Sequence, residues 1–336
     1  MAIQVQTDDR IRLTASVLLL TKFVEENPGF KPHPLKTATL EHLIPHADHP
    51  CAVASREIAE ACWMSAFYGF AVGLHGPRKR FGPREGVLPF GGDPRFLQWL
   101  KPFPEKNYAC LLGSFYEDAA MGPFWEGTAA LWEEVAADCR ACLEDCGLER
   151  FLELLFGSSP LGLTLVPNPL DPPTFGFGPN DGETIYAIYG PPTVPLDTDR
   201  SVSYSGYGSE FAYLAFHEFS HTLWDKAREQ HPAAIEQTAP LEAKMKLTGW
   251  FPEMYETWDI RFDEIFIRAA TALYHEYLEG EAAAQAALDR EKRDFGIDLV
   301  EPVFLCLRDY LAARERGEYR NLGEYLPVLA ASLTES

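Results

Sequence analysis

Apolar residues recur every three or four positions through much of this chain, the spacing that places them on one face of an α-helix. In residues 10–26, for example, Ile11, Val17, Leu18 and Phe23 stand among polar residues. Patterns of this kind predict helices over residues 10–26, 54–74, 128–156, 259–280, 281–295 and 301–316, with a further helix beginning within 108–116. The first pattern stops at an Asn-Pro-Gly sequence and the long 128–156 pattern at a Gly-Ser-Ser-Pro sequence, both typical helix ends. The chain is therefore predicted to be mostly helical.

Two short runs rich in β-forming residues interrupt this pattern. They are residues 161–166 (LGLTLV) and 184–189 (TIYAIY), and the sequence between them ends in Asn180-Asp181-Gly182, a tight-turn signal. Ser209 is then placed to cap a helix that contains His217 and His221. We expect an α+β fold, predominantly helical, with a small β-sheet just ahead of this helix.

The domain organisation follows from the same change of pattern. Residues 1–157 are predicted to form a helical N-terminal region and residues 158–336 a second region, the two packed as one compact unit. A length of 336 residues is sufficient for a sizeable core. Pro- and Gly-rich connections predict a long loop over residues 76–93 and a second loop over 191–195.

The charge balance narrows the classes of partner. The chain has 29 basic and 50 acidic residues, a formal net charge of -21. Such a surface repels phosphate backbones and anionic lipids, so we expect neither nucleic acid nor a membrane as a partner. No stretch approaches the roughly 20 apolar residues that a membrane span requires.

The cysteines and the N-terminal segment indicate which cellular compartment to expect. Seven cysteines do not suit a disulfide framework, and the apolar segment at residues 15–21 lacks the flanks of a signal peptide. Reduced thiols in the cytoplasm are the expectation.

The sequence His217-Glu218-Phe219-Ser220-His221 carries the chemistry. Residues four apart lie on one face of a helix, so both imidazoles can bind one metal ion. Imidazole nitrogens are common zinc ligands, and Glu218 follows the first of them closely enough to reach a water molecule on the metal. Zinc lowers the pKa of such a water towards ~7, and Glu218 can then accept its proton. The pattern predicts a hydrolytic zinc site.

A third protein ligand is needed to complete a catalytic zinc site. Glu264 is the best candidate because it stands among apolar residues of a predicted buried helix, where a carboxylate is costly unless it meets a cation. Arg268, one turn further on, could orient it. Asp263 and Glu256 are alternative third ligands. If Asp263 does not bind the metal itself, it could instead hydrogen-bond to a metal ligand and orient it. Without a metal, Glu264 and Arg268 would form an ordinary helical ion pair.

The chain resembles gluzincins, the zinc peptidases whose third ligand is a glutamate. The resemblance rests on the motif and on the sequence some forty residues later, Glu264-Ile265-Phe266-Ile267-Arg268-Ala269. More narrowly, the chain resembles the predicted bacterial metalloproteases grouped as domain-of-unknown-function family 4932. The shared features, which extend to about residue 280, are Asp9-Arg10-Ile11, Asp48-His49-Pro50, Asn168-Pro169-Leu170, residues 184–191 (TIYAIYGP), His217 to Ser220, and Glu264 to Ala269.

The resemblance implies a zincin-like catalytic core that holds Zn²⁺ through His217, His221 and Glu264, with Glu218 as the general base. It implies no particular substrate. Members of that family often look secreted or lipid-anchored, whereas this sequence is not expected to carry an export signal, which argues against an extracellular role.

A donor for the developing oxyanion should complete such a site. Tyrosine is a common choice in gluzincins, and Tyr255 and Tyr274 are the leading candidates. Tyr204, Tyr207 and His275 stay open as well, and the sequence does not choose among them.

The expected activity is zinc-dependent hydrolysis of peptide bonds in a peptide or protein substrate, held as an added strand along residues 184–189. Two alternative functions remain open. One is a catalytically inactive protein of zincin fold that binds a peptide or a partner. The other is a helical structural protein in which the motif is coincidental.

Overall fold

The computed structural model describes residues 2–25, 33–76, 82–83, 105–191 and 202–335. These residues form two compact units. The sheet unit comprises Ala2–Glu144 and Leu161–Phe211, and the helical unit comprises Asp145–Pro160 and Ala212–Ser336. This division differs from the expected boundary at residue 157, because the strands group with the N-terminal helices and not with the helix that carries the histidines.

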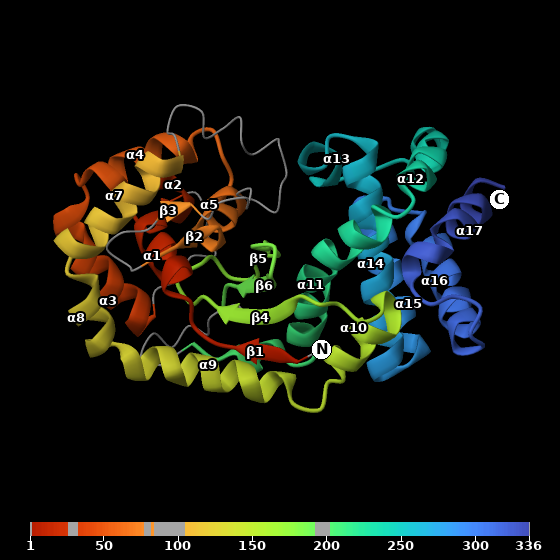
Figure 1. Ribbon diagram of the computed structural model, residues 1–336, viewed down its shortest axis with the longest axis horizontal. Coiled ribbons are helices and arrows are strands. Elements are labelled where there is room, and N and C mark those ends of the chain that lie inside the picture. Colours follow the sequence, from red (N-terminus) through yellow and green to blue (C-terminus); the bar gives the residue numbers. More distant parts are fainter. Residues whose placement is uncertain (1, 26–32, 77–81, 84–104, 192–201, 336) are drawn as a thin grey trace. The chain divides into compact units, whose positions relative to one another are not determined.

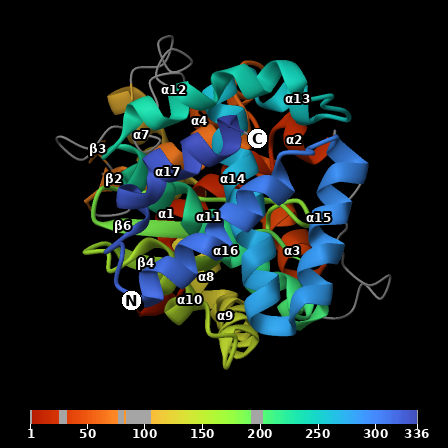
Figure 2. The same ribbon diagram turned by 90° about the vertical axis from the view of Figure 1, so that its right-hand side faces the viewer.

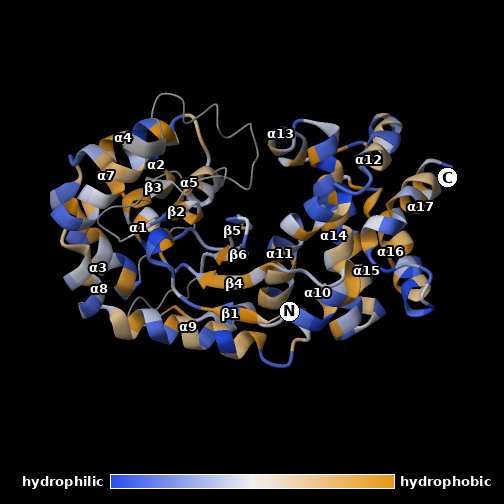
Figure 3. Ribbon diagram, viewed as in Figure 1, coloured by the Kyte–Doolittle hydropathy of each residue, from blue (hydrophilic) through white to orange (hydrophobic). Residues whose placement is uncertain are grey.

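The sheet unit is built on a four-stranded mixed sheet. Its strands lie in the order β1 (Ile3–Val5), β4 (Gly162–Pro167), β6 (Thr184–Tyr189) and β5 (Gly176–Phe177). The first three are parallel and β5 is antiparallel to β6. Both predicted strands are confirmed as β4 and β6. Strand β4 is buried after its first residue, as its apolar sequence requires, and α9 (Ala129–Leu143) runs beside β1 and β4 (Figures 1 and 3).

Strand β6 is not available to hold a substrate as an added strand. Along one edge it pairs with β4 over its full length. Along the other, Ile188 and Tyr189 pair with β5, and Asn180 forms an antiparallel bridge with Ile185. The expectation that a substrate adds to residues 184–189 is therefore wrong, because both edges of the strand are already paired within the unit.

Several helices of the sheet unit are shorter than their sequence pattern suggested. Besides α9, the helices in the described part of the sheet unit are α1 (Asp9–Leu18), α2 (Lys22–Glu25), α3 (Pro34–Leu43), α4 (Pro50–Ala59), α5 (Met64–Val72), α7 (Glu105–Asp118) and α8 (Met121–Gly127). The unit also contains the short 3-10 helices η1 (Ile44–His46) and η4 (Tyr204–Tyr207) and the strand pair β2 (Leu74–His75) and β3 (Gly82–Pro83). The predicted helices at 10–26 and 54–74 are each divided in two.

The predicted single helix over residues 128–156 is wrong. Helix α9 ends at Leu143, Glu144 is extended, and a new helix, α10 (Leu148–Phe156), begins in the other unit. Asp145 and Gly147 both have positive φ angles, 61° and 65°, and a left-handed residue cannot continue a right-handed helix. Aspartate and glycine are residues that tolerate this conformation.

The helical unit centres on α14 (Trp258–Glu279), which packs against α15 (Glu281–Phe295) and α16 (Val300–Glu315) (Figures 1 and 2). The patterns at 259–280, 281–295 and 301–316 predicted these three helices to within a residue. The remaining elements are α10, α11 (Glu210–Arg228), α12 (Pro232–Thr238), the 3-10 helix η5 (Ala239–Lys244), α13 (Phe251–Met254) and α17 (Leu322–Thr334). Helix α11 begins directly after Ser209, the predicted cap.

Three further expectations can be compared with the structure. All seven cysteines lie in the described residues and are free thiols. Within the described ranges, no helix combines the length and the apolar character needed to cross a bilayer. The loops expected at residues 76–93 and 191–195 lie mostly outside the described residues.

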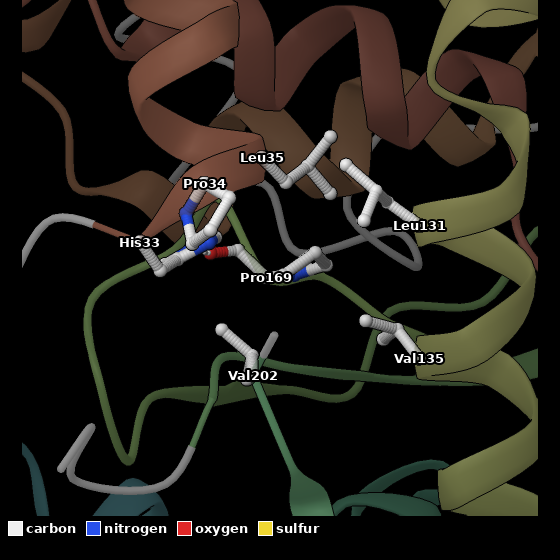
Figure 4. A pocket seen from close by; sticks show the side chains of 7 residues that line it. All are labelled: His33, Pro34, Leu35, Leu131, Val135, Pro169 and Val202. Atoms are coloured by element: carbon white, nitrogen blue, oxygen red, sulfur yellow. Dashed lines mark hydrogen bonds between the residues drawn. The ribbon is translucent and has the colours of Figure 1, made fainter. Parts of the chain in front are cut away.

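His33 is a buried polar residue of the sheet unit, at the edge of a small apolar cavity (Figure 4). The cavity measures about 10 Å³, room for at most one water molecule. Nε2 of His33 lies 2.7 Å from the carbonyl oxygen of Pro169, and Nδ1 accepts a hydrogen bond from the backbone amide of Lys36 at the start of α3. Because one nitrogen must donate and the other accept, the imidazole fits this position only in its neutral form.

We expect His33 to make the fold sensitive to acid. Burial lowers the pKa of His33 to about 4, although the hydrogen bond to Pro169 opposes this shift. The unfolded chain, with a histidine pKa near 6.5, then binds the proton first. The stability that neutral His33 provides is complete above pH 6.5 and is lost as the pH falls towards 4. At pH 5 the loss should be roughly 2 kcal/mol.

Urea unfolding at pH 7.5 and at pH 5 measures this effect. The variant His33→Gln should lose less stability between the two pH values than the wild type does. His231→Gln, at an exposed histidine just before α12, should keep the wild-type difference. Equal pH dependence in His33→Gln and the wild type would show that His33 does not contribute.

Candidate metal centre

Helix α11 presents the two motif histidines on one face. His217 and His221 are one turn apart, and the centres of their rings are 5.0 Å apart. Their side chains are 20% and 36% exposed, so solvent reaches this face of the helix.

Aromatic packing between α11 and α14 sets the position of the third ligand. The ring of Phe216 lies 5.0 Å from that of Tyr274, and the ring of Trp224 stacks on Phe266 at 3.7 Å. These contacts flank the histidines along α11 and fix how α14 lies against it. Glu264 lies two residues before Phe266 on α14, and its carboxylate faces both histidines.

Asp263, which the sequence offered as an alternative third ligand, does not face the histidines but contacts other side chains of α11. One carboxylate oxygen accepts a hydrogen bond from Nε1 of Trp224 at 2.6 Å, and the other contacts Nη1 of Arg228 at 2.5 Å. Its two oxygens thus tie α14 to α11. Glu256, the other alternative, is exposed, and neither residue belongs to the cluster of ligand atoms described next.

His217, His221 and Glu264 form a group that could hold a metal ion. The three ligand atoms all lie within 4.8 Å of one another. Nε2 of His217 is 3.7 Å from Oε1 of Glu264, and Nε2 of His221 is 3.9 Å from Oε2. These separations are too long for hydrogen bonds and slightly wider than the roughly 3.4 Å between ligand atoms of a tetrahedral ion with ~2.0–2.1 Å bonds. Three such groups around one point could share a cation.

The electrostatics of the group favour a cation. Glu264 is only 2% exposed; burial opposes its ionisation, but Arg268 and the two histidines outweigh burial and lower the pKa of Glu264 to about 2. Burial lowers the pKa of His217 to about 3, although Glu264 opposes the shift. The carboxylate is therefore charged and the imidazole of His217 neutral at pH 7, the protonation states in which both bind metals.

Arg268 lies where its position one turn after Glu264 suggested. Its Nε donates to Oε1 of Glu264 at 2.7 Å. The ion pair that could have replaced a metal site is therefore present together with the three converging ligands, and it leaves Oε2 of Glu264 facing His221.

Glu218 and Tyr255, the predicted general base and a candidate oxyanion donor, lie beside these ligands. Glu218 follows His217 directly and is 9% exposed. Burial, followed by the charge of Glu264, raises the pKa of the Tyr255 phenol above its ordinary value, and Glu218 contributes in the same direction. Tyr255 therefore lies within electrostatic reach of both carboxylates and stays protonated.

The other candidate oxyanion donors are engaged elsewhere. The hydroxyl of Tyr274 donates to the carbonyl of Cys146 at 2.8 Å, and the ring of His275 stacks on Tyr213 at 3.4 Å. Tyr204 and Tyr207 belong to the sheet unit, where their hydroxyls donate to backbone carbonyl groups. Among these candidates, Tyr255 is the one within electrostatic reach of Glu264 and Glu218, and its phenol is hydrogen-bonded to Arg268.

The sequence did not point to Glu291 or to the aromatic residues around Arg268. Glu291 contacts Nη1 of Arg268 at 2.5 Å, and Trp250, Phe251 and Phe295 surround the guanidinium. No fixed spacing links these positions to the motif, so only the packing of α13 and α15 against α14 reveals them.

Comparison with known proteins places the chain in a family. No curated protein and no solved structure matches it. The model of one family, described as a domain of unknown function (DUF4932), matches residues 91–332, a range that contains every residue of the metal centre but not the shared features near Asp9 and Asp48. Because this range covers more than half of the sequence, the chain belongs to the DUF4932 family.

Proposed function

We propose that this chain is a zinc-dependent metallopeptidase of the gluzincin type, with a zincin-like catalytic core. The observation that supports it best is the buried carboxylate of Glu264, whose two oxygens face Nε2 of His217 and Nε2 of His221. A buried charged carboxylate is costly without cations, and Arg268 contacts only one of its oxygens.

The donor set suits zinc. Two imidazole nitrogens and one carboxylate are a common set of three protein ligands in catalytic zinc sites, which leave a further position open. The exposure of the two histidines is consistent with an open position on the solvent side. When bound, zinc would supply a Lewis acid that polarises a carbonyl group and makes a water molecule more acidic.

Residues of the chain would then transfer the protons and stabilise the negative charge that develops on the substrate. A carboxylate oxygen of Glu218 takes the proton from the attacking water and passes it to the nitrogen of the leaving amine. The phenol of Tyr255, which its raised pKa keeps protonated, donates a hydrogen bond to the oxygen of the substrate carbonyl as negative charge develops there. The proposed substrate is a peptide or a protein.

Incubation of the purified protein with a mixed peptide library, read by mass spectrometry, tests this function. We expect cleavage products in the presence of zinc, their loss after treatment with a chelator, and their return when zinc is restored. Cleavage that the chelator leaves unchanged would contradict the proposal. Bound zinc without any cleavage would favour the alternative, an inactive zincin-like protein that binds peptides or a partner.

A further inference from the structure

Arg268 connects the candidate ligand Glu264 to a second carboxylate, that of Glu291. Nε of Arg268 donates to Oε1 of Glu264 at 2.7 Å, and Nη1 donates to Oε2 of Glu291 at 2.5 Å. All three side chains are largely buried, with 14% exposure for Arg268, 2% for Glu264 and 16% for Glu291. The connection crosses from α14 to α15, which lie side by side (Figure 2).

Three aromatic rings confine the guanidinium between these carboxylates. Cζ of Arg268 lies 5.0 Å from the ring centre of Phe295, 5.6 Å from that of Phe251 and 5.7 Å from that of Trp250. Rings at these distances attract a cation and restrict access of water to it. The two carboxylates each hold a different nitrogen of the guanidinium, and together with the phenol of Tyr255, which also hydrogen-bonds to Arg268, they decide how it turns within the rings.

The charges around Arg268 also bear on a bound cation. Glu264 and Arg268 alone form a neutral pair, and a ligand carboxylate whose charge is neutralised in this way attracts a dication less strongly. Glu291 adds a second negative charge, so the three groups together carry one net negative charge. In a buried site, where screening is weak, this charge should favour metal binding.

We propose that Glu291 is a positioning residue of the metal centre, which acts through Arg268 to orient Glu264 and to keep the site negative. This inference rests on the proposed metal site. It assigns to α15 a role in metal affinity that neither the motif nor the ligand set indicates. Partners of this kind, one step removed from a ligand, typically change metal affinity by about 10–100-fold when they are lost.

The test is the dissociation constant for Zn²⁺, measured by competition with a chromophoric chelator. Glu291→Gln keeps the shape of the side chain and removes its charge, and it should weaken zinc binding by about 10–100-fold. Glu291→Asp, which retains the charge, should recover part of the affinity. Glu281→Gln, at an exposed glutamate in the first turn of the same helix, is the matched control and should bind zinc as the wild type does.

A double-variant cycle separates positioning from a general effect on folding. If Glu291 orients Glu264 through Arg268, then Glu291→Gln should weaken zinc binding clearly less in an Arg268→Gln background than in the wild type, where positioning and charge are both lost. Thermal unfolding of the metal-free proteins identifies any variant that fails to fold. If Glu291→Gln does not fold, the zinc affinity of Glu291→Asp is compared with that of the wild type instead. Wild-type affinity in a folded Glu291→Gln variant would overturn the inference but leave the proposed function intact. Absence of zinc binding in the wild type would instead overturn the proposed function.

Discussion

Glu218→Gln should bind zinc like the wild type and cleave peptides roughly 10²–10⁴-fold more slowly. The substitution retains the size of the side chain but removes the oxygen that accepts the proton of the attacking water. It should leave the metal ligands intact because Glu218 is not one of the three converging groups. Single-turnover cleavage of the best peptide from the library, together with the zinc content of each preparation, measures both effects.

A charge-matched control shows whether the loss is specific to Glu218. Glu229→Gln, at an exposed glutamate directly after α11, removes the same charge and should cleave at the wild-type rate. If Glu218→Gln were as fast as the wild type, Glu218 would not be the general base and the proposed mechanism would be wrong.

Glu264→Gln is expected to abolish the stabilisation of the protein by zinc. The variant lacks the one charged ligand, and its affinity should fall by more than the roughly 10–100-fold that loss of a neighbouring partner costs. Arg268 keeps Glu291 as a partner, so the metal-free fold should survive. Zinc should raise the midpoint of thermal unfolding in the wild type but not in Glu264→Gln, because a ligand stabilises only the state that binds it.

The controls for this prediction distinguish the ligand from its neighbours. Glu279→Gln, at an exposed position near the end of α14, should keep the zinc-dependent shift. Asp263→Asn should also keep it, because Asp263 bonds to Trp224 and Arg228 and not to the metal group. Loss of the shift in Asp263→Asn combined with its retention in Glu264→Gln would assign the ligand to Asp263.

The local parts of the candidate site could be predicted from the sequence. His217 and His221 share a face because four residues make about one helical turn, whatever the rest of the fold does. Glu264 was identified because a carboxylate among apolar residues needs a cationic partner. The patterns of α14, α15 and α16 were equally clear, since each helix buries one regular stripe of side chains.

The parts that depend on long-range packing could not be predicted. The central place of β6 is decided by its pairing with β4 and with the segment around β5, and neither partner leaves a signal in the sequence of β6 itself. The break between α9 and α10 depends on two left-handed residues, Asp145 and Gly147, within an otherwise helical pattern. Glu291 meets Arg268 only because α15 packs on α14.

The choice of Tyr255 among the candidate tyrosines also depends on long-range packing and could not be predicted from the sequence. Tyr274 is one of the better placed tyrosines by sequence, in the same helix as Glu264, yet its hydroxyl bonds to the carbonyl of Cys146. Tyr255 lies outside the regular helices, directly after α13, where no periodicity indicates which way its side chain points.

The zinc content of the purified protein tests the central claim most directly. Elemental mass spectrometry of the wild-type protein after reconstitution should give close to one zinc per chain, and a His217→Ala variant prepared in parallel should give much less. One zinc per chain in the wild type that depends on His217 would establish the metal site on which the proposed function rests. Absence of zinc from the reconstituted wild-type protein would contradict the account.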